Sequence, residues 1–198
     1  MIKIFNKWDT SSIKVEDQGL VRYINIQPIT VPRTGGRQAK YRFYKSTAVN
    51  IVERLMNKLQ IPGHRGKKHF RTSGHCTGKA VRLYNTIFRT FLIIEKQLNK
   101  NPVEVFVKAL ENAAPREEIT SIEYGGARYP QAVECAPQRR IDITLKMFVQ
   151  GAYSKCFNAK KKLEEALADE IIKAYNLDQT STAIAKKLEL ERQAESSR

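Results

Sequence analysis

The sequence predicts a mainly α-helical protein: a bundle of about six helices, a protruding two-stranded β-ribbon and an irregular N-terminal arm. Apolar residues recur at three- and four-residue spacing along most of the chain, which is typical of amphipathic helices. Helix-start residues precede several of these stretches. Residues 117–136 are instead rich in β-branched and aromatic residues around a Gly-Gly pair. We therefore divide the chain into an arm, 1–39, and a helical domain, 40–198.

The arm mixes polar and apolar residues and contains several prolines and glycines. We expect one short extended piece, Val21 to Ile26, and a turn or loop at Pro32 to Gly36. The first helix is predicted to be capped by Ser46 or Thr47 and to run to about Leu59, because apolar residues repeat there at helical spacing.

A loop over 61–78, rich in Gly, His, Lys and Arg, separates this helix from the next. Thr77 is predicted to cap a long helix that runs to about Leu98. Its apolar stripe leaves Arg82 and Arg89 on the other side. These two cations are therefore expected to face outward.

The next helix begins at Asn101-Pro102-Val103-Glu104, where Asn caps, Pro suits the first helical position and Glu can reach back to the cap. Pro115 marks its end. The β-ribbon at about 117–136 follows, and Pro130 in its second arm indicates an edge strand. Because an isolated two-stranded ribbon is marginal in water, it should lean on helices or on a partner.

Three further helices complete the prediction. One follows Pro137 and runs to about Cys156, and Asn158 is predicted to cap the next. After a polar linker at 176–181, Ser181 is predicted to cap a last helix. That helix has few apolar residues, so we expect it either to dock on something outside this domain or to fray.

Charge is concentrated in one third of the chain. The formal net charge is +15, and residues 40–100 contain fourteen of the 35 basic residues but only two of the 20 acidic ones. Neutralising the phosphates of a polyanion releases condensed counterions and drives binding. A local excess of this size indicates a nucleic-acid binding surface.

The sequence argues against membrane and secreted classes. No apolar run approaches the ~18–20 residues that span a bilayer, and Met1 to Asp9 lacks the apolar core of a signal peptide. Three widely spaced cysteines do not suggest a disulfide framework. We expect no membrane partner and a location in the reducing cytoplasm.

Two motifs suggest chemistry that we do not favour. Gly74 to Ala80 is one residue short of a P-loop and lacks its Ser or Thr, although a Gly-Lys helix start suits an RNA phosphate. His64, His69, His75 and Cys76 lie close enough in sequence for zinc, but the Cys-x-x-Cys signature is absent. Contact of these histidines with RNA or water is the alternative. We predict no metal, no cofactor and, since no catalytic set emerges, no enzymatic activity.

Cations and aromatic residues around the ribbon favour RNA. Arg139 and Arg140 open a helix against its dipole, a cost that phosphates would remove. Arg128 and Tyr129 at the ribbon tip are residue types on which RNA bases stack, although Tyr129 also suits cross-strand packing. The run 160–162 (Lys-Lys-Lys) fits either a solvated helix face or RNA contact.

Several motifs in order carry a resemblance to a known family over nearly the whole chain. They are Trp8, Gly19 to Asn25, Thr34 to Arg37, Ile51 to Leu59, Thr77-Gly78-Lys79, Asn101 to Phe106, Gly125-Gly126, Pro137 to Arg140 and Ala166 to Ile172. The chain resembles the small ribosomal subunit protein seven family (universal ribosomal protein S-seven), in its archaeal and eukaryotic form.

The resemblance implies a helical bundle with a β-ribbon that binds the 3′ major domain of small-subunit rRNA and nucleates assembly of the head. It implies that the ribbon tip lies near the exit-site tRNA and the mRNA path. It also implies that the C-terminal helix approaches the platform protein numbered eleven. The loop 61–76 is more basic and richer in His than the family pattern.

Together, the charge and the resemblance give the expected site residues. Those for rRNA are Arg37, Lys40, Arg42, Lys45, Arg65, Lys67, Lys68, Arg71, Lys79, Arg82, Arg116, Arg139, Arg140, Lys146 and Lys155. Those of the ribbon tip near tRNA and mRNA are Gly125, Gly126, Ala127, Arg128 and Tyr129.

Two other functions are possible for a basic protein of this kind, and the sequence favours neither. A free regulatory RNA- or DNA-binding protein would place the helix 77–98 in a major groove, but its apolar stripe suits a core and no dimer seam is evident. An RNA-modifying enzyme would need a cofactor loop or a catalytic cluster, and the sequence contains neither.

Overall fold

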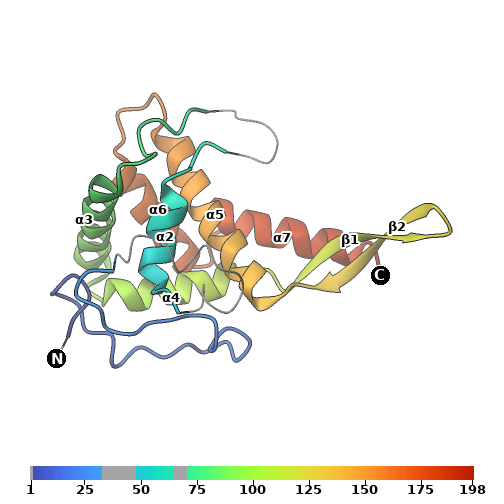
Figure 1. Cartoon of the computed structure of the whole chain (residues 1–198), viewed down its shortest axis with the longest axis horizontal. Helices are drawn as coiled ribbons and strands as arrows, with labels where there is room; N and C mark the ends of the chain where they lie inside the picture. The colour runs from blue at the N-terminus through green and yellow to red at the C-terminus, as the bar shows by residue number, and fades with distance from the viewer. Residues whose placement is uncertain (1, 33–47, 65–70) are drawn as a thin grey trace.

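The computed structural model describes residues 2–32, 48–64 and 71–198, and within them it confirms a mainly helical fold with one two-stranded ribbon (Figure 1). The ribbon projects from one end of a compact group of helices. The elements are α2 (Ile51–Leu59), α3 (Ala80–Leu98), α4 (Pro102–Ala113), β1 (Glu117–Tyr124), β2 (Ala127–Glu134), α5 (Pro137–Cys156), α6 (Leu163–Tyr175) and α7 (Thr182–Glu195).

The core forms around α6, which packs against α3, α4 and α5. The apolar stripes predicted on these helices meet there, and three fully buried phenylalanines run through the centre. The ring centroids of Phe91 and Phe106 lie 6.1 Å apart, and those of Phe106 and Phe148 lie 6.5 Å apart. Aromatic packing of this kind contributes both buried area and defined geometry, so the helices have fixed relative positions.

The N-terminal segment contributes directly to this core. Ile4, Phe5 and Trp8 are buried, and the Phe5 and Trp8 rings contact Phe88 and Phe91 of α3. The expected turn at Pro32 to Gly36 lies, from residue 33 on, outside the described residues. The segment up to residue 32 is thus held against the helices by aromatic packing.

The predicted extended piece at Val21 to Ile26 is wrong for most of its length. The backbone N–H groups of Leu20 and Tyr23 donate to the carbonyls of Asp17 and Leu20, at 2.9 Å each, which are turn bonds. The Asp17 carboxylate accepts a hydrogen bond from the N–H of Gly19, an Asx-type turn that competes with extended structure. Only Asn25 forms a β-bridge, with Asn50.

Arg140 ties this segment to the helices. Its guanidinium, in a residue that is 9% exposed, contacts the Asp17 carboxylate at 2.7 Å and donates from Nε to the carbonyl of Pro115 at 3.0 Å. Burial raises the pKa of Asp17, but the hydrogen bond and charge of Arg140 outweigh burial, so its pKa lies below the ordinary value of 3.8. The ion pair therefore joins the N-terminal segment, the link before β1 and the start of α5.

Two helices begin later than predicted. The first starts after Asn50, whose side chain accepts from the N–H of Val52 at 2.9 Å; Ser46 and Thr47 lie outside the described residues. Thr77 does not cap α3, since its hydroxyl donates to the carbonyls of Ser73 and Gln60 and Lys79 holds the cap position. At α2 the cause is that Asn50 competes with Ser46 and Thr47 as a competent cap, whereas α3 begins with no capping side chain.

The predicted Asn cap and Pro start of α4 are confirmed, and α6 is present as predicted, but its predicted cap is wrong. Asn101 accepts from the N–H of Val103 at 3.1 Å. Asn158 does not cap α6 but adopts a left-handed conformation (φ +54°) in the preceding turn. Lys162 holds the cap position, and its N–H donates to the carboxylate of Glu165 at 3.4 Å.

The last helix docks on its own chain, so the expected fraying is not observed, and the expected external partner stays a prediction. It packs against β1 and α5, with Ala183, Ile184 and Ala194 buried. Polar contacts replace the missing apolar ones: the Lys187 ammonium donates to the carbonyl of Asn112 at 2.8 Å. These contacts explain how a helix with a weak apolar stripe is held.

Glu170 joins three helices through one buried carboxylate. Ser181 is the N-cap of α7, as predicted, but its hydroxyl does not cap; it donates to Glu170 Oε2 at 3.1 Å. The N–H of Thr182 donates to the same oxygen at 3.0 Å, and Lys155 of α5 lies 2.5 Å from Oε1. Gly151 makes room for this contact, because a Cβ there would overlap the Thr182 hydroxyl.

The predicted ribbon is confirmed as an antiparallel pair with Glu117 opposite Glu134 and Tyr124 opposite Ala127. Gly125 and Gly126, with φ of +60° and +80°, make the two-residue turn that matches strand twist. Pro130 pairs across to Ser121 in a sheet with only two strands, as expected for an edge. Helix α7 supports the base of the ribbon, while residues 120–131 are exposed.

Glu170→Gln should lower the free energy of unfolding by about 2 kcal/mol, because the amide is uncharged and has one accepting oxygen where the carboxylate has two, so Lys155 loses its ionic partner. Urea unfolding followed by circular dichroism measures this. The matched control is Glu134→Gln at an exposed position, expected within about 0.5 kcal/mol of the natural protein. Equal midpoints for the two variants would contradict the role of Glu170.

Asp17→Asn should destabilise the protein by about 1 kcal/mol at neutral pH and by less at low pH. A carboxyl whose folded pKa lies below its unfolded value stabilises the fold above that unfolded value. The stabilisation is lost as the pH falls through the folded pKa. Urea titrations at pH 7 and pH 3 should show the difference from the natural protein shrinking; a constant difference would refute the ion-pair assignment.

Candidate nucleic-acid interface

The expected RNA-binding cations fall into three groups in the structure, and a fourth set cannot be placed. Arg37, Lys40, Arg42, Lys45, Arg65, Lys67 and Lys68 lie outside the described residues, as does His69. The others occupy the end of the body where α3 begins, the foot of the ribbon, and the outer face of α5.

The first group forms because two distant segments meet. The Arg71 guanidinium donates to the carbonyl of Ser154 at 2.7 Å and lies 5.2 Å from the ring centroid of Phe157. The Tyr153 hydroxyl donates to the carbonyl of Thr72 at 2.5 Å. These contacts fasten the segment before α3 onto the last turn of α5.

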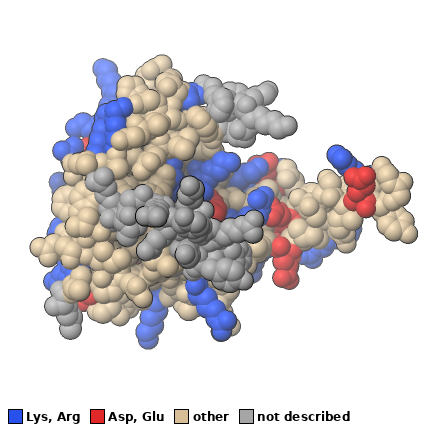
Figure 2. Space-filling model, viewed as in Figure 1, with Lys and Arg blue, Asp and Glu red and all other residues tan. Residues whose placement is uncertain are grey.

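We call the surface built by this junction the basic end. It consists of Arg71, Lys79, Arg82, Arg89, Lys155, Lys160, Lys161 and Lys162. Lys155 and Lys161 form ion pairs with Glu170 and Asp169. Arg82 and Lys162 are exposed and have no carboxylate partner among the described residues. Blue side chains gather at the upper left of the body in Figure 2.

The stems of the loop 61–78 are held in place beside the basic end. The N–H of Gly63 donates to the Ser73 hydroxyl at 3.0 Å, which joins the two stems. The amide of Gln150 on α5 donates to the carbonyl of His64 at 2.5 Å. The described parts of the loop are therefore tied to each other and to α5, so the exposed cations next to them have defined positions.

The start of α3 is electrostatically favourable for an anion. No side chain caps it, and its first turn contains no acidic residue. The Lys79 ammonium donates to the carbonyl of Gly74, which holds this cation next to the helix start. Free N–H groups and the positive end of the helix dipole attract phosphate, as the Gly-Lys motif predicts.

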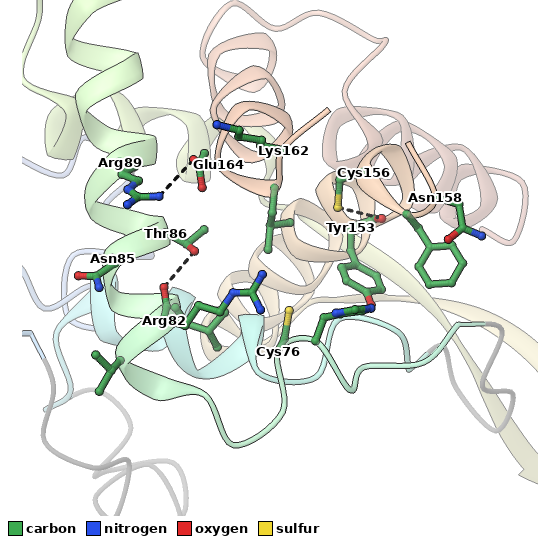
Figure 3. A pocket seen from close by; sticks show the side chains of 15 residues that line it. Cys76, Arg82, Asn85, Thr86, Arg89, Tyr153, Cys156, Asn158, Lys162 and Glu164 are labelled. Carbon is green, nitrogen blue, oxygen red and sulfur yellow. Dashed lines mark hydrogen bonds and ion pairs between the residues drawn. The ribbon is translucent and has the colours of Figure 1, made fainter. Parts of the chain in front are cut away.

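A groove of about 780 Å³ opens between α3 and the α5–α6 turn (Figure 3). Arg82 and Arg89 line it from α3, and Lys162 reaches toward α3 from the start of α6. Arg89 lies 3.7 Å from Glu164, the one acidic residue of the lining. Cys76, Leu83 and Tyr153 form buried parts of the lining, so the groove has an apolar floor and a cationic rim.

The second group, at the foot of the ribbon, differs from its prediction. The argument from the helix dipole assigned Arg139 and Arg140 to phosphates, but carboxylates of the chain itself neutralise them. Arg139 lies 2.5 Å from Glu118, and Arg140 is buried against Asp17. Arg116 is exposed at the start of β1 and remains accessible to a ligand.

The third position, Lys146, is exposed on the outer face of α5. Lys146, Lys58 and His64 line a small recess, and the two lysines place further positive charge near the stem of the loop 61–78. Lys58 lies 3.2 Å from Asp142, so part of this charge is compensated.

The ribbon tip presents two chemically different faces. Ile122, Tyr124 and Tyr129 share one face and are 44%, 82% and 58% exposed. Tyr129 lies opposite Ile122, so it is both a cross-strand neighbour and an accessible ring. The other face carries an ion pair between Arg128 and Glu123 at 3.4 Å. Exposed rings at the end of a narrow projection suit stacking against bases.

The described residues form neither a metal site nor a membrane-spanning helix. In the part of the chain that the structure describes, no three His, Cys, Asp or Glu side chains are grouped to hold a metal ion. His64 and His75 are exposed there, whereas Cys76 is buried. None of the described helices has the length and apolarity needed to cross a bilayer.

Sequence reasoning left Arg89, Lys160 and Lys162 out of the expected set. The lysine run has no periodic signal that separates a solvated face from a binding surface. Its position becomes evident only when the α5–α6 turn is seen to lie against the start of α3.

The chain is similar to known proteins over most of its length. The family model described as ribosomal protein S7p/S5e matches residues 21–198. The chain is 53% identical over 197 residues to the small ribosomal subunit protein uS7 of Nanoarchaeum equitans (strain Kin4-M), covering 100% of this chain and 99% of that protein. A match of this extent and identity shows that the chain belongs to the ribosomal protein S7p/S5e family.

Proposed function

We propose that the chain is a structural, RNA-binding constituent of the small ribosomal subunit and not an enzyme. The observation that carries the proposal is the basic end, where exposed cations from α3 and the α5–α6 turn converge on a body with a defined core. Membership of a ribosomal protein family supports ribosomal RNA as the partner of this surface. The protein is then located on the ribosome, in the cytoplasm.

Binding on this account is architectural. Cations held at fixed separations bind phosphates with less loss of side-chain entropy than a flexible basic tail would. The contacts of Arg71 with Ser154 and Phe157, and of Tyr153 with Thr72, supply this rigidity. Each phosphate contact adds to the salt dependence of binding.

The finer assignment follows the family resemblance. We propose that the RNA is the 3′ major domain of the small-subunit rRNA and that binding nucleates assembly of the head. The ribbon tip, Gly125 to Tyr129, would lie near the exit-site tRNA and the mRNA path. The region of α7 would approach the neighbouring platform protein numbered eleven. The ribbon projects beyond the helices, which is compatible with contact between its tip and a tRNA or mRNA outside the body of the protein (Figure 1).

The structure revises which cations we expect to touch RNA. Lys79, Arg82, Arg116 and Lys146 are exposed and remain in the proposal, as does Arg71 at the junction. Arg140 is left out, because its guanidinium is buried in an ion pair with Asp17. The ion pairs of Arg139 and Lys155 make their phosphate contacts weaker candidates. Arg37, Lys40, Arg42, Lys45, Arg65, Lys67 and Lys68 stay predictions from the sequence alone.

The regulatory alternative is less well supported. A reading helix must expose one long face to a groove, but α3 buries Leu83, Ile87, Phe91 and Ile94 against the bundle. The part of α3 that lines the groove at the basic end is its first half, Val81 to Arg89. A surface that uses one end of a helix suits the phosphates of folded RNA better than it suits a DNA major groove.

The double variant Lys79→Ala/Arg82→Ala should weaken binding to a transcript of the rRNA head domain. It should also reduce the slope of log K against log salt by about 2, since each cation neutralises roughly one phosphate. Fluorescence anisotropy at several KCl concentrations, with bulk RNA as competitor, measures both. The control Lys14→Ala/Lys96→Ala removes the same charge at exposed positions elsewhere and should change the slope far less. Equal effects of both pairs would mean that the charge acts nonspecifically.

Gly126→Val should disturb the ribbon tip while leaving the helical body stable. Its φ of +80° disfavours a β-branched residue, although a Cβ would meet no other atom within 4 Å. Ribosomes reconstituted with this variant should release exit-site tRNA at an altered rate or lose reading-frame fidelity. Thr120→Val, lower on the ribbon at an exposed position, is the matched control. Unchanged release and frame maintenance in Gly126→Val ribosomes would count against the role of the tip.

A further inference from the structure

The groove at the basic end has a composition that phosphate binding alone does not require. Its rim carries Arg82, Arg89 and Lys162, but its interior is lined by Cys76, Tyr153, Cys156, Phe157 and Leu163. A surface that only neutralises a helix backbone needs an exposed array of cations and no recess with apolar walls. The recess is therefore complementary to a ligand that is charged at one end and that is apolar and flat at the other.

An unpaired nucleotide has this chemistry. Its phosphate suits the cationic rim, and its base offers apolar faces with hydrogen-bonding edges. A volume of about 780 Å³ lies within the range of about 300–1,000 Å³ typical of small-ligand sites. A paired A-form helix keeps its bases inside the duplex and cannot insert one into the groove without extruding it.

We infer that the groove between α3 and the α5–α6 turn binds an unpaired nucleotide of the RNA. This inference rests on the proposed function and adds the kind of RNA element that the basic end recognises. Arg82 and Lys162 hold the flanking phosphates, since both are exposed and lack a carboxylate partner among the described residues. The base enters between the α3 wall and the aromatic wall of α5.

The walls supply suitable contacts for a base. Phe157 is partly exposed in the groove, and its ring is already flanked by the Arg71 guanidinium at 5.2 Å and by Tyr153 with ring centroids 5.8 Å apart. Asn85 of α3 and Asn158 of the α5–α6 turn also belong to the lining, and their amide groups both donate and accept. This set combines stacking surface with groups that can read a base edge.

The charges also favour a nucleotide over an apolar peptide. Three cations and His75 line the groove, against Glu164 as the single acidic residue of the lining. Arg89 is 3.7 Å from Glu164, so only one cation is partly compensated. An apolar peptide would leave Arg82 and Lys162 without a partner at its edge, whereas a nucleotide carries the charge that they match.

The test fills the groove without changing its charge. Asn85→Trp and Val81→Trp place a large ring from exposed positions on the α3 wall, and Gln97→Trp makes the same change near the far end of α3, outside the groove. Binding is measured to the head-domain transcript, to a single-stranded RNA of mixed sequence and to a blunt RNA duplex of equal length. Circular dichroism and urea midpoints identify any variant that fails to fold, and having two groove variants guards against that loss.

Asn85→Trp and Val81→Trp should each weaken binding to the transcript and to the single strand by roughly tenfold, the effect of losing about one stacked base. Binding to the duplex should change less than twofold, and Gln97→Trp should affect none of the three. Unchanged affinity for the single strand, or equal losses on the single strand and the duplex, would overturn the inference. If the natural protein does not prefer the transcript to bulk RNA, the proposed function itself fails, which is a separate result.

Discussion

The carboxylate of Glu170 lies fully buried where α5, α6 and α7 meet, and the geometry of both ends of the molecule depends on it. It accepts the first N–H of α7 in place of a capping side chain and thereby sets the direction of that helix. Helix α7 in turn supports β1 and the base of the ribbon. Through Lys155 the same carboxylate holds the last turn of α5, next to the α5–α6 turn that forms one wall of the groove. A buried charge is stable here only because its partners come from all three helices.

The cations of this protein divide into two classes by what surrounds them. Arg140 and Lys155 are paired with Asp17 and Glu170 and hold elements of the fold together. Arg82 and Lys162 have no carboxylate partner in the described part of the chain and lie at the rim of an apolar groove. The ion pairs of the first class hold the elements of the fold together, and this fixes the distances between the cations of the second class. A basic protein of this kind recognises RNA through the arrangement of its charge, since total charge alone would bind any polyanion.

Most of the fold could be predicted from the sequence because local signals agree with tertiary packing: Asn101-Pro102 begins α4, Pro137 begins α5 and Gly125-Gly126 makes the ribbon turn. Predictions failed where a local turn competes with the expected element, as at the Asp17 Asx-type turn and at the left-handed Asn158 before α6. They also failed where a contact from another helix decides, since the carboxylate of Glu170, and no capping side chain, accepts the first N–H of α7. The same holds for the site. Exposed Lys79 and Arg82 were found by charge, but only the fold shows that Arg140 is buried and that Lys162, the last residue of the lysine run, faces α3.

We propose that one end of a preformed body binds RNA while the rest keeps its structure. Amide hydrogen exchange of the protein, free and bound to the head-domain transcript, can distinguish this from folding on binding. The account predicts added protection concentrated in residues 71–89 and 154–164, with little change in the core of α4 and α6, which is already protected in the free protein. Protection spread evenly over the chain would show folding on binding. Protection absent from the basic end would place the RNA on another surface and contradict the account.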